Sequence, residues 1–474
     1  MLPYHWLRRT IHVLFVSNLL TAGASHLSMA EPGHPGSTSQ LAQCATLGLS
    51  SCPQPIDAVL PDPAHMLSWD QHTRVVGFRS TFRQYPADVI HTQGGNAYPL
   101  PEANKAMPPL QYKMDGNTYR LKDYLQRQSV TGLLILKNGQ RVYEYYGRGN
   151  TDKTLWTSRS VAKSVVSVLV GMAINEGLIG AVGDPITRYL PELKGSAWET
   201  VTLRDLLQHT SGVIWNENYA DPTSEFAHLT LCEAGPSAYQ CVWQLISTLK
   251  RQPGISPGQM WSYNTGGAWL VGRILERATG MTIAGYLETR LWSRFAMEGD
   301  GVWEALVKGQ VDMGGHGFNA TLRDWGRFGL FVAGGGKLSN GQELLPKEWI
   351  AQSVTWSTAK NSVTPATPNG QFGYQWWFNG VDPARADTAN AVQTAQHTFW
   401  AEGIYGQAIA INPSENLVMV QWSVWKEADA PTALYDEQAL FFSAVAHALS
   451  QTGNRTHPAM KTAPRARSAR HCCL

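Results

Sequence analysis

The sequence predicts an α/β fold (α+β in the way strands and helices are segregated), in which an antiparallel sheet is flanked by helices. Residues 133–146 hold two apolar runs separated by Asn138-Gly139, a strong signal for a tight β-hairpin. A second hairpin is expected near the end of the chain, with strands at 407–412 and 417–424. Helical patterns lie between the hairpins, at 160–176, 201–208, 266–279 and 283–293. Strands from both ends of the chain are therefore expected to complete one sheet around a helical insert.

Composition sets the expected domain boundaries. Residues 31–65 are rich in Pro, Gly and Ser and predict a linker or an irregular wrap. Residues 66–450 are expected to form one folded domain, with the helical insert at about 177–300 and a last helix from 431. Residues 451–474 are polar and basic, which predicts a disordered tail.

The first thirty residues predict a signal peptide. Arg8 and Arg9 precede a short apolar stretch, and small residues follow, with cleavage expected after Ala24 or Ala30. The apolar stretch is too short and too interrupted to span a bilayer, and no other segment is apolar enough to do so. We therefore expect a periplasmic or secreted protein with no transmembrane span in the mature chain.

Charge excludes one class of partner. The chain of 474 residues has 38 Lys and Arg, 36 Asp and Glu, and a formal net charge of +2. The two terminal segments carry 2 and 5 of the basic residues and no acidic one, which leaves 31 basic against 36 acidic residues in between, a net charge of −5. A folded body of that sign makes nucleic acid an unsuitable partner.

The cysteines also fit export. Cys44 and Cys52 are close along the chain, as are Cys232 and Cys241, and each pair is able to close a short loop in an oxidising compartment. The sequence alone leaves the pairing open. Neither spacing suits a zinc site, and we expect no metal and no cofactor.

A Ser-x-x-Lys pattern, which is able to supply a nucleophile and its base, occurs four times. Ser247, Ser357 and Ser423 lie at an expected helix end, in a polar loop and at a strand end. Ser160 instead opens an almost entirely apolar run, which predicts a buried helix whose start Thr157 or Ser158 would cap.

Lys163 lies one turn after Ser160 on the same face. Burial would lower the pKa of its amine and let it act as a base for the serine hydroxyl. The alternative is a lysine that extends to the surface, which fits this apolar helix poorly.

A third side chain that could take part in catalysis, Tyr263, is expected on a short loop before a helix. Tyr263 follows a Pro-Gly turn and precedes the apolar pattern at 266–279. Its phenol would relay a proton if neighbouring cations lowered its pKa. The alternative is a tyrosine that only packs.

Four motifs occur in the same order as in a known enzyme family. They are Ser160-Val161-Ala162-Lys163, Leu-Gln-His-Thr-Ser-Gly at 207–212, Tyr263-Asn264-Thr265, and Gly-Ile-Tyr-Gly-Gln at 403–407. With Gly-Gly-His-Gly-Phe at 314–318, they make residues 66–450 resemble the class C β-lactamase and D,D-peptidase superfamily. Within it, the sequence is most similar to the 6-aminohexanoate-dimer (nylon-oligomer) hydrolases and related esterases. The resemblance implies a β-lactamase/transpeptidase-like fold with an all-helical subdomain.

The resemblance also implies roles for single residues. Ser160 would be the acylated nucleophile, Lys163 its base, and Tyr263 the group that passes a proton to the leaving group. The backbone N–H groups of Ser160 and Ile404 would form the oxyanion hole. The substrate-binding residues would be Tyr219, His316, Thr265 and Gly403.

Two departures bear on the substrate. The family's Lys-Thr-Gly is replaced by Ala401-Glu402-Gly403, and the third residue of Tyr-x-Asn is Thr265. An acid in place of a base disfavours a substrate carboxylate, so we expect small linear amides or esters. The alternatives are a β-lactamase or D,D-peptidase, and a non-catalytic cell-wall or partner-binding module on the same fold. The oligomeric state is not determined by the sequence.

Overall fold

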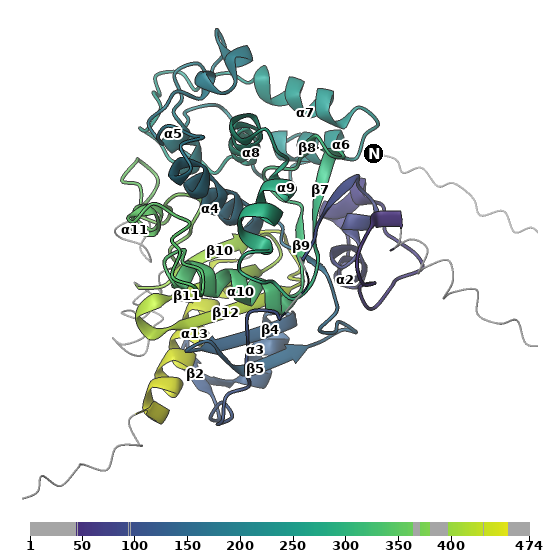
Figure 1. The fold of residues 1–474 in the computed structure, drawn as a ribbon, viewed down its shortest axis with the longest axis vertical. Helices are drawn as coiled ribbons and strands as arrows, with labels where there is room; N and C mark the ends of the chain where they lie inside the picture. The colour runs from purple at the N-terminus through teal and green to yellow at the C-terminus, as the bar shows by residue number, and fades with distance from the viewer. Residues whose placement is uncertain are drawn as a thin grey trace, which may run out of the picture.

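The computed structural model describes residues 44, 46–92, 94, 96–363, 370–379, 397–429 and 431–453 (Figure 1). The expected signal peptide at 1–30 and the tail from 454 onwards, with Cys472 and Cys473, lie outside these residues.

The main sheet joins the two ends of the domain, as expected. Its five strands are all antiparallel, in the order β10 (Phe399–Gly403), β11 (Gln407–Asn412), β12 (Leu417–Ser423), β4 (Val130–Lys137) and β5 (Gln140–Tyr146). The C-terminal strand β12 pairs with the N-terminal strand β4, so that Met419 lies opposite Ile135. Both expected hairpins are confirmed.

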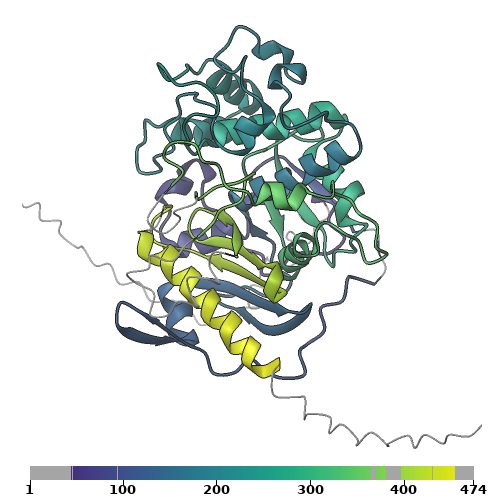
Figure 2. The ribbon, with the colours of Figure 1, turned by 90° about the vertical axis from the view of Figure 1, so that its left-hand side faces the viewer.

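The sheet is covered on both faces because alternate residues of each strand point to opposite sides. Leu133 and Ile135 pack with α13 (Thr432–Gly453), while Leu134 and Leu136 belong to the larger core on the other face. Gly326 lets α10 (Leu322–Ala333) come close to that face. Figure 2 shows α13 lying across the sheet.

Most of the helices between the two halves of the sheet gather at one end of the molecule, whereas α10 lies against the sheet (Figure 1). Those expected from the sequence are α4 (Val161–Asn175), α5 (Leu203–Leu207), α8 (Thr265–Thr279) and α9 (Ile283–Leu287), the last continuing as a π-helical turn, η5 (Glu288–Trp292). The sequence did not predict α6 (Glu225–Glu233), and of α7 (Ala238–Ser247) it predicted only the helix end near Ser247. The remaining helices are α2 (Gln71–Phe78), α3 (Leu121–Arg127) and α11 (Trp349–Ser353).

A second sheet was not predicted. It has the order β1 (Ala87–Ile90), β7 (Gly301–Val307), β9 (Phe318–Ala320) and β6 (Trp156–Thr157), and β8 (Val311–Asp312) also pairs with β7. A separate ribbon is formed by β2 (Gln111–Met114) and β3 (Asn117–Arg120). Several of these strands have two to four residues, too few for an alternating pattern to be recognised.

The segment before the domain lies against its body. A disulfide joins Cys44 to Cys52, and Asp57 forms an ion pair with Arg79 at 2.6 Å. A second disulfide, Cys232–Cys241, links α6 to α7.

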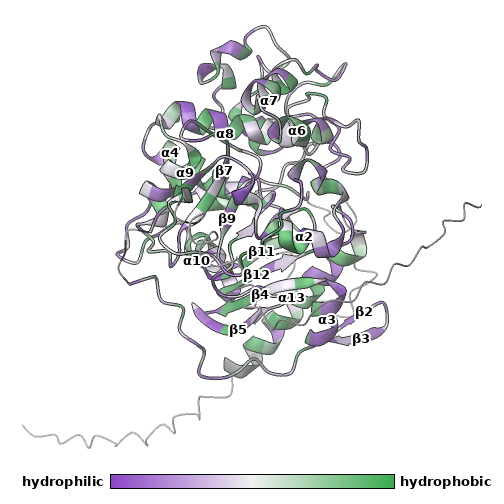
Figure 3. Ribbon diagram, turned by 90° about the vertical axis from the view of Figure 1, so that its right-hand side faces the viewer, coloured by the Kyte–Doolittle hydropathy of each residue, from purple (hydrophilic) through white to green (hydrophobic). Residues whose placement is uncertain are grey.

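Hydrophobic residues are concentrated in the central strands and the helices around them, whereas α3 and the β2–β3 ribbon are largely hydrophilic (Figure 3). None of the helices in the described ranges is both long enough and apolar enough to cross a bilayer.

Candidate active site

Ser160 lies at the junction of the second sheet and the buried helix α4. Strand β6 ends at Thr157, and the N–H of Ser158 donates to the Phe318 carbonyl of β9 at 2.7 Å. The next residue, Arg159, has a left-handed backbone with φ 48°. This turn brings Ser160 to the start of α4, which begins at Val161.

The prediction that a side chain caps the start of α4 is wrong. Neither Thr157 nor Ser158 accepts a hydrogen bond from the first turn, and the Ser158 hydroxyl donates to the Arg159 carbonyl instead. Short backbone bonds, such as Val161 N–H to the Ser158 carbonyl at 3.2 Å, close the turn. Backbone bonding of this 3₁₀ type is an ordinary substitute for a cap.

The Lys163 amine contacts the Ser160 hydroxyl. Nζ lies 2.9 Å from Ser160 Oγ and 2.8 Å from the carbonyl oxygen of Gly315. Lys163 is 3% exposed on a helix buried over most of its length, so it does not extend to the surface.

Burial lowers the pKa of Lys163 to about 8, and the carboxylates of Glu217 and Glu233 oppose part of that decrease. A lysine with this pKa is unprotonated in about a tenth of the molecules at pH 7 and in about half of them at pH 8. Its free amine is then able to accept the proton of Ser160.

Tyr263 reaches the same point from the loop before α8. His209 braces this loop on both sides of the tyrosine: its carbonyl accepts from Ser262 N–H at 2.8 Å, and its Nδ1 accepts from Asn264 N–H at 3.2 Å. The Tyr263 ring stacks on Trp377, with centroids 5.3 Å apart. Its hydroxyl is hydrogen-bonded to Ser160.

The expectation that cations lower the pKa of Tyr263 is wrong. Burial raises its pKa, and the carboxylate of Glu217 raises it further, while the hydrogen bond with Ser160 offsets only part of the increase. Lys163 Nζ lies 5.2 Å from the centroid of the tyrosine ring. Tyr263 therefore remains a neutral phenol, which donates a proton, and the group that titrates near neutral pH is Lys163.

Two backbone N–H groups are free beside Ser160. In the described part of the chain, the N–H of Ser160 and that of Ile404 have no hydrogen-bond partner. Gly403 allows the approach, because a Cβ there would lie 2.6 Å from the Ser158 carbonyl oxygen and 3.0 Å from the Ser160 nitrogen. Free donors converging at this point are suited to a developing oxyanion.

Glu217, which sequence reasoning missed, organises the other side of the site. Its carboxylate accepts from Thr265 N–H at 3.0 Å, from Thr265 Oγ1 at 2.5 Å and from the Tyr219 hydroxyl at 3.1 Å. Trp215 Nε1 is a further donor. No motif in the sequence marks a lone glutamate in a loop, so only the fold reveals this role.

His316 lies beside the site but its side chain is buried. Nε2 lies 2.9 Å and 3.1 Å from the two carboxylate oxygens of Glu233, a residue that the sequence did not single out. Only 8% of His316 is exposed.

Glu402 and Gly403 lie at the end of β10. Burial raises the pKa of Glu402 to about 8, although a hydrogen bond from Asn379 opposes the increase and nearby Asp429 adds to it. Near neutral pH this side chain is therefore mostly a neutral acid. At this position the side chain therefore offers no cation to a substrate carboxylate.

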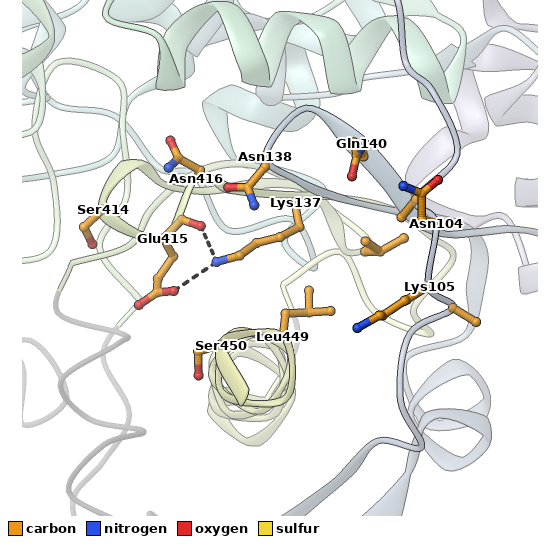
Figure 4. Close-up of a pocket in the computed structure, with 13 residues that line it drawn as sticks. Asn104, Lys105, Lys137, Asn138, Gln140, Ser414, Glu415, Asn416, Leu449 and Ser450 are labelled. Carbon is orange, nitrogen blue, oxygen red and sulfur yellow. Dashed lines mark hydrogen bonds and ion pairs between the residues drawn. The ribbon is translucent and has the colours of Figure 1, made fainter. Parts of the chain in front are cut away.

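The side of the site formed by Tyr263 and Glu217 lines a cavity of about 750 Å³, whose wall does not include Ser160 or Lys163. Its wall includes Glu217, Tyr219, Trp261, Tyr263 and Tyr405. A second hollow of about 450 Å³ lies by the turn of the β4–β5 hairpin, where Lys137 reaches Glu415 at 3.1 Å and the end of α13 supplies Leu449 (Figure 4). The wall of this second hollow includes none of Ser160, Lys163 and Tyr263.

The other Ser-x-x-Lys patterns are placed differently. Ser247 is the last residue of α7, Ser357 lies in a loop, and Ser423 ends β12. No hydrogen bond joins any of these serines to its lysine in the described ranges. No metal-binding group of three or more His, Cys, Asp or Glu side chains occurs among the same residues.

The profile of the family described as Beta-lactamase matches residues 120–439, well over half of the sequence. The chain belongs to the Beta-lactamase family. This family consists of serine hydrolases of the β-lactamase and penicillin-binding superfamily, so the resemblance noted in the sequence is confirmed.

Two relatives with known names are consistent with this family assignment. The chain is 28% identical to a 6-aminohexanoate-dimer hydrolase of Paenarthrobacter ureafaciens over 338 residues, which cover 67% of this chain and 79% of the relative. It is 24% identical to a β-lactamase of Yersinia enterocolitica over 341 residues, 63% of this chain and 84% of that one.

Solved structures confirm the predicted fold class. A Bacillus anthracis protein proposed to be a 6-aminohexanoate-dimer hydrolase superposes with a TM-score of 0.66 at 21% identity, covering 79% of this chain and 94% of its own. At this identity the similarity establishes the fold alone.

We predict that the Lys163 amine titrates near pH 8 rather than near the usual value of about 10.4. Glu217→Gln removes a carboxylate that stabilises the ammonium form, so this pKa should decrease further. NMR titration of the lysine Nζ groups in ¹⁵N-lysine-labelled protein, assigned with Lys163→Met, measures both values. A Lys163 resonance that titrates near 10.4 would contradict the assignment of a buried amine.

Proposed function

We propose that this protein is an exported serine hydrolase that cleaves small linear amides or esters through an acyl-enzyme on Ser160. The observation that supports the proposal most strongly is the Lys163 amine, buried and 2.9 Å from Ser160 Oγ. The domain at 66–450 would carry this activity without a cofactor.

Acylation begins with proton transfer from Ser160 Oγ to the free amine of Lys163 as Oγ attacks the substrate carbonyl carbon. The carbonyl oxygen becomes an oxyanion, which the N–H groups of Ser160 and Ile404 stabilise. The phenol of Tyr263 gives its proton to the leaving nitrogen or oxygen as the bond to the carbonyl carbon breaks. The ammonium of Lys163 then returns a proton to the tyrosine.

Deacylation follows the same steps in reverse with water in place of the leaving group. A water molecule attacks the ester carbonyl and gives a proton to Tyr263 as the phenol passes its own proton to the Lys163 amine, while the oxyanion forms again at the same two N–H groups. Ser160 Oγ leaves with the proton that the Lys163 ammonium returns. The products are a carboxylic acid and an amine or alcohol.

The side chains around the cavity favour a substrate without a carboxylate near the scissile bond. Glu402 occupies the place of a family lysine, and Glu217 lies across the site. Tyr219, beside Tyr263 in the cavity wall, would contact the amide or ester. Thr265, whose hydroxyl donates to Glu217, and Gly403, at the end of β10, are the other proposed substrate-binding residues. Near neutral pH Glu402 is mostly uncharged and offers no cation to a substrate carboxylate, while the carboxylate of Glu217 would repel one. In related enzymes, β-lactams and D-Ala-D-Ala peptides are bound through such a carboxylate.

Export is part of the proposal. Arg8, Arg9 and the apolar stretch after them favour a cleaved signal peptide, and the disulfides Cys44–Cys52 and Cys232–Cys241 suit an oxidising compartment such as the periplasm.

Removal of the nucleophile or its base should abolish turnover of a chromogenic short-chain ester. We expect Ser160→Ala to retain the fold with no measurable turnover, and Lys163→Ala to decrease kcat by at least about 10³-fold, because an unactivated serine is a poor nucleophile. Ser247→Ala, at the end of α7, is the matched control and should keep wild-type kinetics. Near wild-type activity of Lys163→Ala at pH 7 would show that the base is another group.

Gly403→Ala tests the oxyanion hole. The added methyl group would collide with the Ser158 carbonyl oxygen and crowd the Ser160 nitrogen, so kcat should decrease on the order of 10²–10³-fold. Gly183→Ala is the matched control, because a Cβ at Gly183 meets no atom within 4 Å. Equal steady-state kinetics of the two variants would exclude the proposed hole.

A substrate panel separates the alternatives. With purified protein, short-chain chromogenic esters and the 6-aminohexanoate dimer should be turned over faster, as measured by kcat/KM, than a chromogenic cephalosporin. Dominant cephalosporin turnover would favour a β-lactamase. No turnover of any of them, and no labelling by a fluorophosphonate, would favour a binding module.

A further inference from the structure

The position of the Lys163 amine depends on a loop that has almost no side chains. Besides Ser160, Nζ donates to the carbonyl of Gly315 in the loop 314–317 between β8 and β9. This loop reads Gly314-Gly315-His316-Gly317, so His316 is its only side chain. The place of the Gly315 carbonyl therefore determines where the amine lies relative to Ser160 Oγ.

The two ends of the loop are held by other groups. Gly314 packs against α8, since a Cβ there would lie 2.8 Å from the Trp269 carbonyl oxygen. The Gly317 carbonyl accepts from Glu304 N–H at 2.8 Å and from Asn319 Nδ2 at 2.8 Å. The middle of the loop, which carries the Gly315 carbonyl, packs against Thr265, and His316 supplies the only side chain of residues 314–317 that can anchor it.

His316 is anchored by a buried carboxylate. Its Nε2 lies 2.9 Å and 3.1 Å from the oxygens of Glu233, whose side chain is 1% exposed. Contact with a carboxylate keeps a proton on Nε2 and fixes the ring. A carboxylate so buried is costly to leave unpaired, so the contact is a strong constraint on both residues.

The carboxylate is itself fixed in place. Glu233 is the last residue of α6, and the preceding residue, Cys232, forms the disulfide to Cys241 of α7. The covalent link holds the end of α6 against its neighbour. A chain of contacts thus runs from the disulfide through Glu233 and His316 to Gly315 and Lys163.

We propose that Glu233 and His316 are positioning residues for Lys163, and that they hold the Gly315 carbonyl where it directs the amine at Ser160. This proposal rests on the proposed function, because it concerns the residues that hold Lys163 in place as the base for Ser160. Neither side chain forms a hydrogen bond with Ser160 or with the Lys163 amine, so in the described part of the chain both act through the loop.

Glu233 also acts on Lys163 through its charge. Its carboxylate, like that of Glu217, raises the pKa of Lys163 against the decrease that burial causes. The other titratable groups facing the amine are Tyr263, at 5.2 Å from Nζ to the ring centroid, and His209, whose pKa burial and the lysine charge lower. Removal of the Glu233 charge should therefore make the ammonium form of Lys163 less stable.

The test is the pH profile of kcat/KM for a neutral short-chain ester. In Glu233→Gln the acidic limb, which follows deprotonation of Lys163, should move to lower pH, and the plateau should decrease on the order of ten- to hundredfold because the amine is misplaced. KM should change less than about twofold. Glu192→Gln, at a half-exposed ion pair with Arg277 on the helical part, is the matched control and should leave the profile unchanged.

A second pair of variants keeps the test valid if Glu233→Gln does not fold. His316→Gln retains an N–H donor for Glu233 and should keep more activity than His316→Ala, at equal melting temperature. Equal activity of the two, or an unchanged limb and plateau in a folded Glu233→Gln, would overturn the proposal. Activity that survives Ser160→Ala would instead overturn the proposed function itself.

Discussion

The site depends on one amine that the fold keeps out of water. Lys163 lies inside an apolar helix, 3% exposed, and burial lowers its pKa to about 8. A charged lysine at this depth is unfavourable unless other groups compensate. Here the compensation is partial: the Ser160 hydroxyl and the Gly315 carbonyl accept hydrogen bonds, while the carboxylates of Glu217 and Glu233 act from a distance. The amine is therefore a base close to neutral pH and not a permanent cation.

The site is assembled at the place where three parts of the fold meet. Strand β6 of the second sheet delivers Ser160 to the start of α4, the edge strand β10 of the main sheet contributes Gly403 and Ile404, and the helical part contributes Tyr263. Gly403 and Gly315 lack side chains at the closest approaches, where a Cβ would crowd Ser160 or Thr265. Rigid secondary structure on both sides of the cleft thus determines the distances between the reacting groups.

Short-range sequence patterns predicted the elements whose structure depends on neighbouring residues, namely tight turns and helices. The Asn138-Gly139 hairpin and the apolar helix after Ser160 follow from turn chemistry and periodicity, and both are present. The second sheet was missed because its strands are short and one, β7, carries the fully buried Glu304, which breaks the apolar pattern. Strand pairing between distant segments supplies the stability that these short strands lack individually.

In the site, too, contacts between residues close in sequence were predictable, whereas contacts between distant segments were not. Ser160 and Lys163 are one helical turn apart, so their contact was predictable from spacing. Glu217 and Glu233 act through contacts between distant segments, and no local pattern marks them. The pKa of Tyr263 was predicted with the wrong sign because the sequence shows nearby cations but not the depth of burial, and burial has the larger effect.

The central claim is tested most directly by mass spectrometry of the protein trapped with a fluorophosphonate. The account predicts a single adduct on the peptide that contains Ser160, formed at a rate that increases with pH through about 8 as Lys163 loses its proton. An adduct on a different serine, or undiminished labelling of Ser160→Ala, would contradict it.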